Sequence, residues 1–260
     1  MEYPHDMGAG QMFEPGKTDI GRQGVLIMRQ ASIIAIAAAV SAGAATAQYT
    51  TVRAPRSGEA SHSQILSSAL GGSFTSATSK DYSNGSIYAD RMKDSTYNSV
   101  GSDRYWAAGT YHAKMVAKEA AYSHTFGTVA GTYGGGNLSG YQALLNSSPV
   151  GTEATVTMDQ DFRWALDVDR GGNHSDVLYT SRDWDNAGST DHMVSYKLLR
   201  DGNLFGYALF FEDIKYCSDK DYNDVAVILT LVPTPQAAMM GLTGLGGLGL
   251  LAGRRRRESM

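Results

Sequence analysis

The sequence predicts a mainly all-β protein: a single β-sandwich or jelly-roll-like domain with an N-terminal signal peptide and a C-terminal transmembrane sorting helix. Three observations support this prediction. Short apolar or alternating runs, separated by clusters of Gly, Asp, Asn and Ser, fill the second half of the 260-residue chain. One apolar segment near the N-terminus ends in small residues. Another, near the C-terminus, is followed by four arginines.

The first part of the chain is expected to carry an export signal. Residues 28–47 have a basic head, an apolar run too short for an ordinary membrane span, and the Ala-x-Ala pattern of Ala45 and Ala47. Signal peptidases cleave directly after this pattern. Residues 1–27 are polar and without pattern, and we expect them to be a non-native upstream extension. A genuine cytoplasmic extension is the alternative.

The region between the two ends, residues 48–231, is long enough for one ordinary domain. Residues 48–235 carry 15 Lys and Arg against 21 Asp and Glu, a net charge of −6, and residues 153–235 alone carry 7 against 15. This acidic excess argues against nucleic acid as a partner and suits a cation-binding surface. Cys217 is the sole cysteine of the sequence, which excludes an intrachain disulfide and a thiolate zinc site.

The first half of this region is less regular. Residues 63–70 before two glycines predict a short helix. Residues 71–104 are rich in Ser, Gly, Asp and Asn, and we expect mostly loops there. Residues 106–121 have helical propensity but continue into 122–126, which has the pattern of a strand, and both interpretations stay open.

Six runs with the length and composition of β-strands follow. They cover residues 154–158, 162–168, 177–180, 192–198, 206–211 and 225–232. Alternation in 193–198 predicts one buried and one solvent-facing side. The last run is apolar throughout, which predicts a central strand covered on both faces. The regular spacing of short strands favours a sandwich over a βαβ fold.

An acidic loop separates the last two predicted strands. Its candidate ligands, within 13 positions, are Glu212, Asp213, Asp219, Asp221, Asn223 and Asp224. Asp219 and Asp221 would lie about 7 Å apart in an extended chain and closer in a curled loop. Oxygen ligands at alternate positions are what Ca²⁺ requires, although the spacing is not that of an EF-hand. The alternative is that these acids solubilise a hairpin loop and cap its turns.

The stretch 211–225 begins Phe-Glu-Asp and ends Ser-Asp-x-Asp-Tyr-Asn-Asp-Val, which resembles the signature of the DUF4114-like domain of many secreted bacterial proteins. Residues 191–196 resemble the penultimate strand of that family. The resemblance covers about residues 190–232. It implies a β-rich domain that is often suspected of binding calcium, with the six residues of the acidic loop as candidate ligands and Asp191 as a weaker one.

The C-terminal segment, residues 232–257, has three parts. Pro233 and Pro235 interrupt the chain, and residues 237–253 are uncharged and apolar. At about 17 residues this stretch is near the lower limit for a membrane span. The basic cluster that follows, which the positive-inside bias would hold in the cytoplasm, is Arg254, Arg255, Arg256 and Arg257.

This tripartite end resembles the PEP-CTERM sorting signals of Gram-negative bacteria in their VPTP-type variant. Such signals are cleaved near the Pro motif by an exosortase. Thr234 stands where the name-giving members have Glu. A plain membrane anchor is one alternative. A hydrophobic core helix is the other, and the glycines of the tail disfavour it.

The sequence offers no catalytic motif. Its histidines form no HxxxH or HxH pair, and there is neither a Gly-x-Ser-x-Gly elbow nor a phosphate-loop lysine. Four aromatic residues, Trp164, Tyr179, Trp184 and Tyr196, would suit a sugar-binding platform, but aromatics at this density more often lie in a core.

We therefore expect an exported, non-enzymatic protein that an exosortase-type protease sorts at the inner membrane. It would be anchored transiently by its C-terminal helix and then delivered to the cell surface or to an extracellular polysaccharide matrix, with Ca²⁺ as its cofactor. Two other functions stay open. One is a secreted carbohydrate- or ice-binding module, and the other is a secreted hydrolase with acids converging in a cleft.

Overall fold

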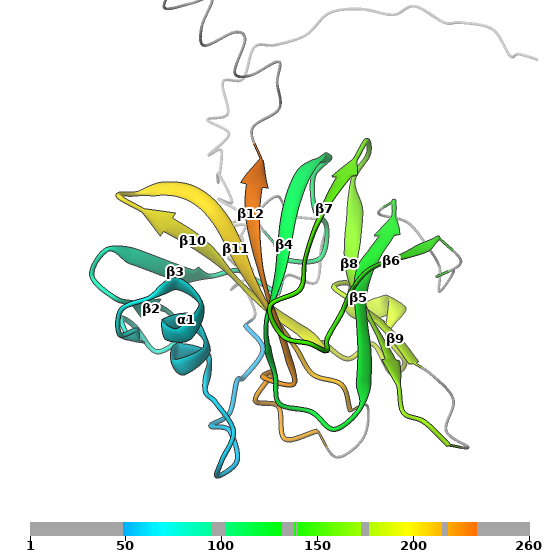
Figure 1. The fold of residues 1–260 in the computed structure, drawn as a ribbon, viewed down its shortest axis with the longest axis horizontal. Coiled ribbons are helices and arrows are strands. Elements are labelled where there is room, and N and C mark those ends of the chain that lie inside the picture. The colour runs from blue at the N-terminus through cyan, green and yellow to red at the C-terminus, as the bar shows by residue number, and fades with distance from the viewer. Residues whose placement is uncertain are drawn as a thin grey trace, which may run out of the picture. The chain divides into compact units, whose positions relative to one another are not determined.

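The computed structural model describes residues 49–94, 102–131, 138, 140–172, 177–214 and 218–232. The predicted signal peptide, with Ala45 and Ala47, lies outside these residues, and so does the sorting signal from Pro233 to Arg257. Within the described residues, no helix combines the length and apolar character needed to cross a membrane. The described chain forms two antiparallel β-sheets, as expected for a mainly β protein (Figure 1).

The larger sheet has eight strands in the order β1-β2-β3-β10-β11-β12-β4-β7. In chain order they are β1 (Thr75–Ser76), β2 (Tyr82–Ser83), β3 (Ile87–Arg91), β4 (Gly109–Lys118), β7 (Glu153–Met158), β10 (Met193–Arg200), β11 (Asn203–Phe211) and β12 (Val225–Val232). All neighbours are antiparallel. Figure 1 shows β12 in the middle of this sheet, between β11 and β4.

The smaller sheet has four antiparallel strands in the order β6-β5-β8-β9. They are β5 (Ser123–Ala130), β6 (Tyr141–Asn146), β8 (Phe162–Asp169) and β9 (Val177–Thr180). This sheet faces the large one across a shared hydrophobic core, in which Phe126 of β5 packs against Trp164 of β8 and Phe211 of β11.

The central strands of the large sheet are buried on both faces, and β12 shows why its sequence is apolar from residue 225 to residue 229. Val225, Val227 and Leu229 belong to the core between the sheets, whereas Ala226 and Ile228 belong to a second core on the opposite face. Successive side chains of a strand point to opposite sides, so a strand between two cores needs apolar residues at every position. The prediction of a central, doubly covered strand is confirmed.

The second core is covered by the helix α1 (His62–Leu70). Ser61 caps its N-terminus in a capping box with Gln64, and Gly71, at φ 79°, ends it by donating its N–H to the carbonyl of Ser67. The ring of His62 stacks on Phe210 with centroids 3.9 Å apart. The predicted helix over 63–70 is therefore confirmed, one residue longer at its start.

Two expectations need correction, and one open segment is decided by the structure. The alternating run 193–198 does not face solvent on one side, because β10 lies under both cores and only Lys197 within that run is not buried. The helical propensity of residues 106–121 yields to strand β4, since pairing with β12 and β7 outweighs local preference. Residues 71–104 include the short strands β1, β2 and β3. Strand β6 had no predicted counterpart.

Candidate cation site

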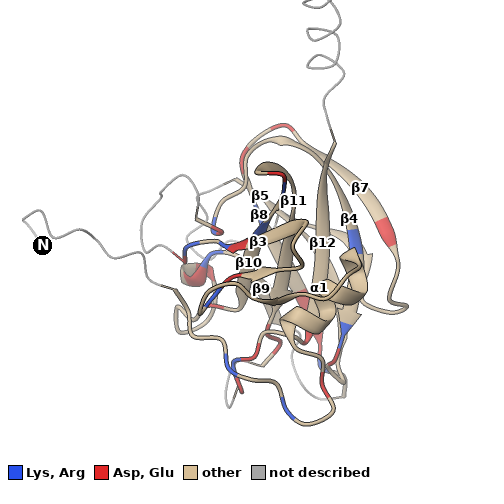
Figure 2. Ribbon diagram, turned by 90° about the vertical axis from the view of Figure 1, so that its left-hand side faces the viewer, with Lys and Arg blue, Asp and Glu red and all other residues tan. Residues whose placement is uncertain are grey.

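The acidic loop begins where β11 ends and closes where β12 begins. Phe211 and Val225 are the last paired residues of these two strands. Glu212 and Asp224 follow directly beyond that pair, so the sheet itself holds them side by side. The backbone N–H of Glu212 donates to the carbonyl of His192 at 3.0 Å, which ties this end of the loop to the start of β10. Figure 2 shows that acidic residues lie mostly in connecting segments such as this one.

Three carboxylates converge at the base of the loop. One oxygen each of Glu212, Asp213 and Asp224 lies within 4.8 Å of the others. We call these three residues the inner triad. Glu212 and Asp213 are each only 1% exposed, and Asp224 is partly buried. Three acids of the predicted set therefore form a compact group at the edge of the core.

The members of the inner triad differ in their internal partners. His124 of β5 donates from Nε2 to Asp213 Oδ2 at 2.8 Å, and the backbone N–H of Asp213 donates to Asp224 Oδ2 at 2.8 Å. Among the described residues, neither carboxylate oxygen of Glu212 has a hydrogen-bond partner of ordinary geometry. A buried carboxylate without a partner is costly, because its hydration is lost without replacement.

Burial of these acids close to one another raises their pKa values. Burial, followed by the negative charges of Asp219 and Asp221, raises the pKa of Glu212 to about 7, and a side-chain hydrogen bond from Ser218 offsets only part of this rise. Burial, followed by the charge of Asp213, raises the pKa of Asp224 to about 9. Both shifts mean that the folded chain favours a proton or another cation at this position.

The remaining acids of the loop form a second group with a residue from far away in the sequence. Asp219 and Asp221 lie with Glu59 so that one oxygen of each is within 4.8 Å of the others. We call these three residues the outer triad. Lys220 and Tyr222 adopt left-handed backbone conformations, with φ of 63° and 56°, which curl the loop and bring its acids together.

The last two predicted ligands lie outside both triads. The side-chain amide of Asn223 donates to the carbonyl of Ala60 at 3.1 Å, so it fastens the loop to the start of α1. The carboxylate of Asp191 accepts from the Thr50 hydroxyl at 2.5 Å and from the Met193 N–H at 3.1 Å. Asp191 therefore belongs to a different buried group.

That group is the Arg91 cluster, which we define as Arg91, Asp94, Asp103 and Asp191. Arg91 Nη2 contacts both oxygens of Asp94, at 3.2 and 3.4 Å, and the Ser195 hydroxyl donates to Asp103 at 3.1 Å. The N–H of Thr50 also donates to Asp94. Burial and the charges of Asp94 and Asp183 raise the pKa of Asp191 to about 7, and burial raises that of Asp103 as well.

The donor chemistry of both triads suits a hard divalent cation. Ca²⁺ takes 6–8 oxygen ligands in a flexible geometry, whereas Mg²⁺ demands a near-ideal octahedron and keeps its waters. Three carboxylates supply several of those oxygens, and backbone carbonyls or water can supply the rest. Sequence reasoning missed Glu59, since it is separated by 160 residues from Asp219 and carries no local motif.

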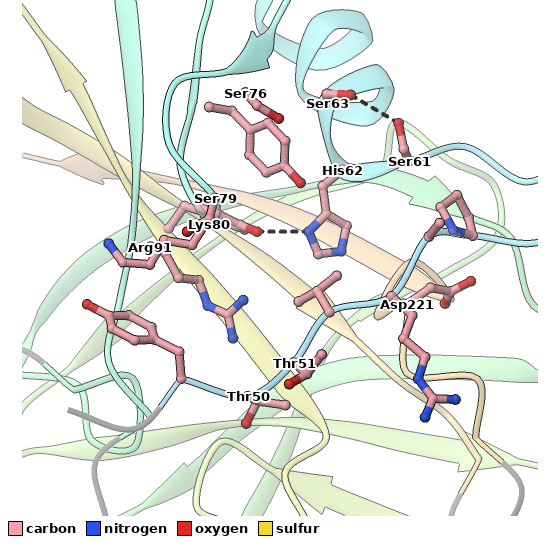
Figure 3. Close-up of a pocket in the computed structure, with 17 residues that line it drawn as sticks. Thr50, Thr51, Ser61, His62, Ser63, Ser76, Ser79, Lys80, Arg91 and Asp221 are labelled. Carbon is pink, nitrogen blue, oxygen red and sulfur yellow. Dashed lines mark hydrogen bonds between the residues drawn. The ribbon is translucent and has the colours of Figure 1, made fainter. Parts of the chain in front are cut away.

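A polar pocket of about 630 Å³ lies beside the outer triad. Residues 49–55 form one wall, and Asp221, His62 and Tyr196 contribute to others (Figure 3). The Tyr196 hydroxyl and His62 Nδ1 are 3.0 Å apart. Of the four aromatics considered as a sugar platform, Trp184 is 58% exposed, while Trp164, Tyr179 and Tyr196 are buried in the two cores.

No protein-family model matches the sequence, and no curated protein shows significant similarity to it. The two family resemblances therefore rest on the residues quoted for them, and the functional argument rests on the geometry of the acids.

Proposed function

We propose that this chain is an exported, non-enzymatic β-domain that binds Ca²⁺ at the inner triad, and that the bound cation couples closure of the acidic loop to folding. The observation that carries the proposal is Glu212, a fully buried carboxylate beside Asp213 and Asp224 whose oxygens have no hydrogen-bond partner of ordinary geometry among the described residues. A buried charge of this kind destabilises the fold unless something neutralises it.

Calcium at this position would act on the centre of the large sheet. Glu212 and Asp224 extend directly from the paired ends of β11 and β12, and both strands contribute to the two cores. A cation that bridges them replaces carboxylate repulsion with attraction at the point where the two strands separate. Binding of this kind stabilises the folded state in proportion to the logarithm of the free cation concentration.

The test is a thermal melt of the full chain with calcium, with magnesium and with chelator. Calcium at about 100 times its dissociation constant would add about 3 kcal/mol to the free energy of unfolding. For a domain of this size the melting temperature would then rise by roughly 5–10 °C. Magnesium is expected to give a smaller shift.

The informative variant is Glu212→Gln, which keeps the volume and removes the charge. It should lose most of the calcium shift and should be no less stable than the natural chain in chelator. Glu153→Gln is the matched control, because Glu153 is half exposed on the edge strand β7 and pairs with Lys114 at 2.7 Å. Identical melts in all three buffers would refute calcium binding and leave acids that are neutralised by protons alone.

The proposal also places the domain outside the cytoplasm. The support is the sequence of the two ends: the Ala-x-Ala leader over 28–47 and the Pro motif, apolar stretch and Arg cluster over 232–257. An exosortase-type protease at the inner membrane would release the domain to the cell surface or the extracellular polysaccharide. Mass spectrometry of the protein from its native cells should find no peptide from residues 28–47 or from the arginine cluster. Recovery of both peptides with the soluble chain would contradict export.

A further inference from the structure

The outer triad joins the acidic loop to the segment that precedes α1. Glu59 comes from that segment, and Asp219 and Asp221 come from the loop, with one oxygen of each within 4.8 Å of the others. The carboxylates of Glu59 and Asp221 face each other closely enough to raise the pKa of Asp221, although burial and Asp219 contribute more. Acids from two distant parts of the chain are thus brought together.

Hydrogen bonds already align the two segments. The N–H of Arg53 donates to the carbonyl of Lys220 at 2.9 Å, and Asn223 donates to the carbonyl of Ala60 at 3.1 Å. The N–H of Arg56 donates to Glu59 Oε2 at 3.1 Å, which orients that carboxylate. Hydrogen bonds on both sides of the triad, each with at least one main-chain group, therefore hold its geometry. A preorganised set of oxygens loses little freedom when a cation binds.

Asp221 provides the second, independent sign of a ligand. Its residue is only 2% exposed, and its Oδ2 has no hydrogen-bond partner among the described residues. Arg56 offers the triad a positive charge, with Nε 2.9 Å from Asp219 Oδ2, but the Arg56 side chain is 67% exposed. An exposed ion pair of this kind contributes little and competes poorly with a divalent cation.

We propose that Glu59, Asp219 and Asp221 form a second site for an oxygen-preferring divalent cation such as Ca²⁺, separate from the inner triad, and that its occupation fastens residues 49–60 onto the acidic loop. Asp221 lines the polar pocket together with residues 49–55 (Figure 3). The same cation therefore fixes the wall of that pocket. The inference does not require the inner triad to bind calcium, since the two triads share no ligand.

The first measurement is the number of calcium ions bound by the full chain, obtained by equilibrium dialysis or calorimetry. The natural chain and the control Glu153→Gln should bind two. Glu59→Gln should bind one, because only the outer triad is lost, and Glu212→Gln should bind one, because only the inner triad is lost. Glu59 is partly exposed, so its replacement by Gln should not prevent folding.

The second measurement tests whether calcium holds residues 49–60 on the acidic loop. Trypsin cuts after Arg53 and Arg56, both of which are exposed in the segment to be fastened. Calcium at ten times its dissociation constant should slow these two cleavages on the order of 10-fold, in the natural chain and in Glu212→Gln. It should leave the cleavage rate of Glu59→Gln, and of the double variant Asp219→Ala with Asp221→Ala, unchanged.

Each outcome decides between the two sites. If Glu59→Gln still binds as many ions as the natural chain and keeps its protection from trypsin, the outer site is refuted. One ion that is lost only in Glu212→Gln would refute the outer site and keep the inner one. One ion that is lost only in Glu59→Gln would do the reverse. A natural chain that binds no calcium would refute both.

Discussion

The acidic loop and the Arg91 cluster are both groups of buried carboxylates, but they differ in what neutralises them. In the Arg91 cluster, Arg91 contacts Asp94, Thr50 contacts Asp94 and Asp191, and Ser195 contacts Asp103. In the acidic loop, Glu212 and one oxygen of Asp221 have no partner of ordinary hydrogen-bond geometry among the described residues. Both groups have carboxyl pKa values raised by burial.

This difference teaches that burial of acids does not by itself indicate a cation site. Where hydroxyls, N–H groups and a guanidinium satisfy the carboxylates, the cluster is part of the fold. Where the oxygens have no such partner among the described residues, we propose that a cation from outside the chain completes the group. The comparison predicts that the two groups respond in opposite ways to the loss of an internal partner and to calcium.

The largest effect is expected from Arg91→Met. It removes the guanidinium of the Arg91 cluster and leaves Asp94, Asp103 and Asp191 buried together. Breaking a buried charge network in this way costs about 3–5 kcal/mol. Urea denaturation should show this loss with calcium and with chelator alike. Recovery of the lost stability on addition of calcium would erase the distinction between the two groups.

The next effect is expected from Thr50→Val, which has nearly the same shape. The variant leaves Asp191 Oδ2 without the hydroxyl that donates to it at 2.5 Å. A hydrogen bond to a charged group contributes about 1.5–3 kcal/mol, and we expect a loss of that size. Thr51→Val is the matched control, because Thr51 is exposed. Equal stabilities of the two variants would show that this contact does not stabilise the cluster.

The pH dependence of stability separates the two groups further. The folded pKa of Asp103 is raised by burial and then by the charges of Asp94 and Asp191, and Asp191 itself is raised to about 7. A raised carboxyl pKa means that the folded state binds more protons than the unfolded state. Its stabilising contribution is therefore complete below about pH 4 and is lost as the pH rises through the folded pKa.

In the presence of chelator, the free energy of unfolding should therefore fall as the pH rises from 5 to 8. Both the acidic loop and the Arg91 cluster should contribute to this fall. Saturating calcium should remove the part that comes from the acidic loop and leave the part from the Arg91 cluster. Asp103→Asn should reduce this remaining slope by up to about 1.4 kcal/mol per pH unit. The exposed Asp201→Asn should leave it unchanged. If calcium abolished the pH dependence of the free energy of unfolding completely, the Arg91 cluster would make no separate contribution to it.

The smallest effect is expected from Arg56→Met. Its ion pair with Asp219 is largely exposed, and such pairs contribute less than about 1 kcal/mol. The variant should therefore unfold at nearly the same urea concentration as the natural chain. It should bind calcium at the outer triad more tightly, because a competing positive charge is gone. Weaker calcium binding would show that Arg56 supports the site.

Much of the β-rich half could be predicted from the sequence because its signals are local. Strand β12 was predicted at Val225–Val232 and β9 at Val177–Thr180, with the bounds that the structure has. The capping residues of α1 also act on their immediate neighbours. Strand β4 was not resolved by its sequence, because its alanines and lysines favour a helix and only pairing with β12 and β7 decides for a strand.

The candidate site was predicted only as a set of residues. The prediction of a cation site in the acidic loop followed from its composition between two apolar strands, and it stays a prediction. That the acidic loop would split into two triads did not follow, because the split depends on the curl at Lys220 and Tyr222. Asp191 and Glu212 are 21 positions apart and were both candidate ligands, Asp191 the weaker one, yet they lie in groups with different partners.

The sequence by itself determined most strands of the second half, the glycine stop of the helix and the concentration of acids between the last two strands, because these depend on residues close together in the chain. The tertiary structure alone decided which acids meet. It brought Glu59 to Asp219 and Asp221, and Thr50 to Asp191, across more than 100 positions. Which carboxylates are left without a partner is a property of the packed sheets and depends on long-range contacts that no local pattern encodes.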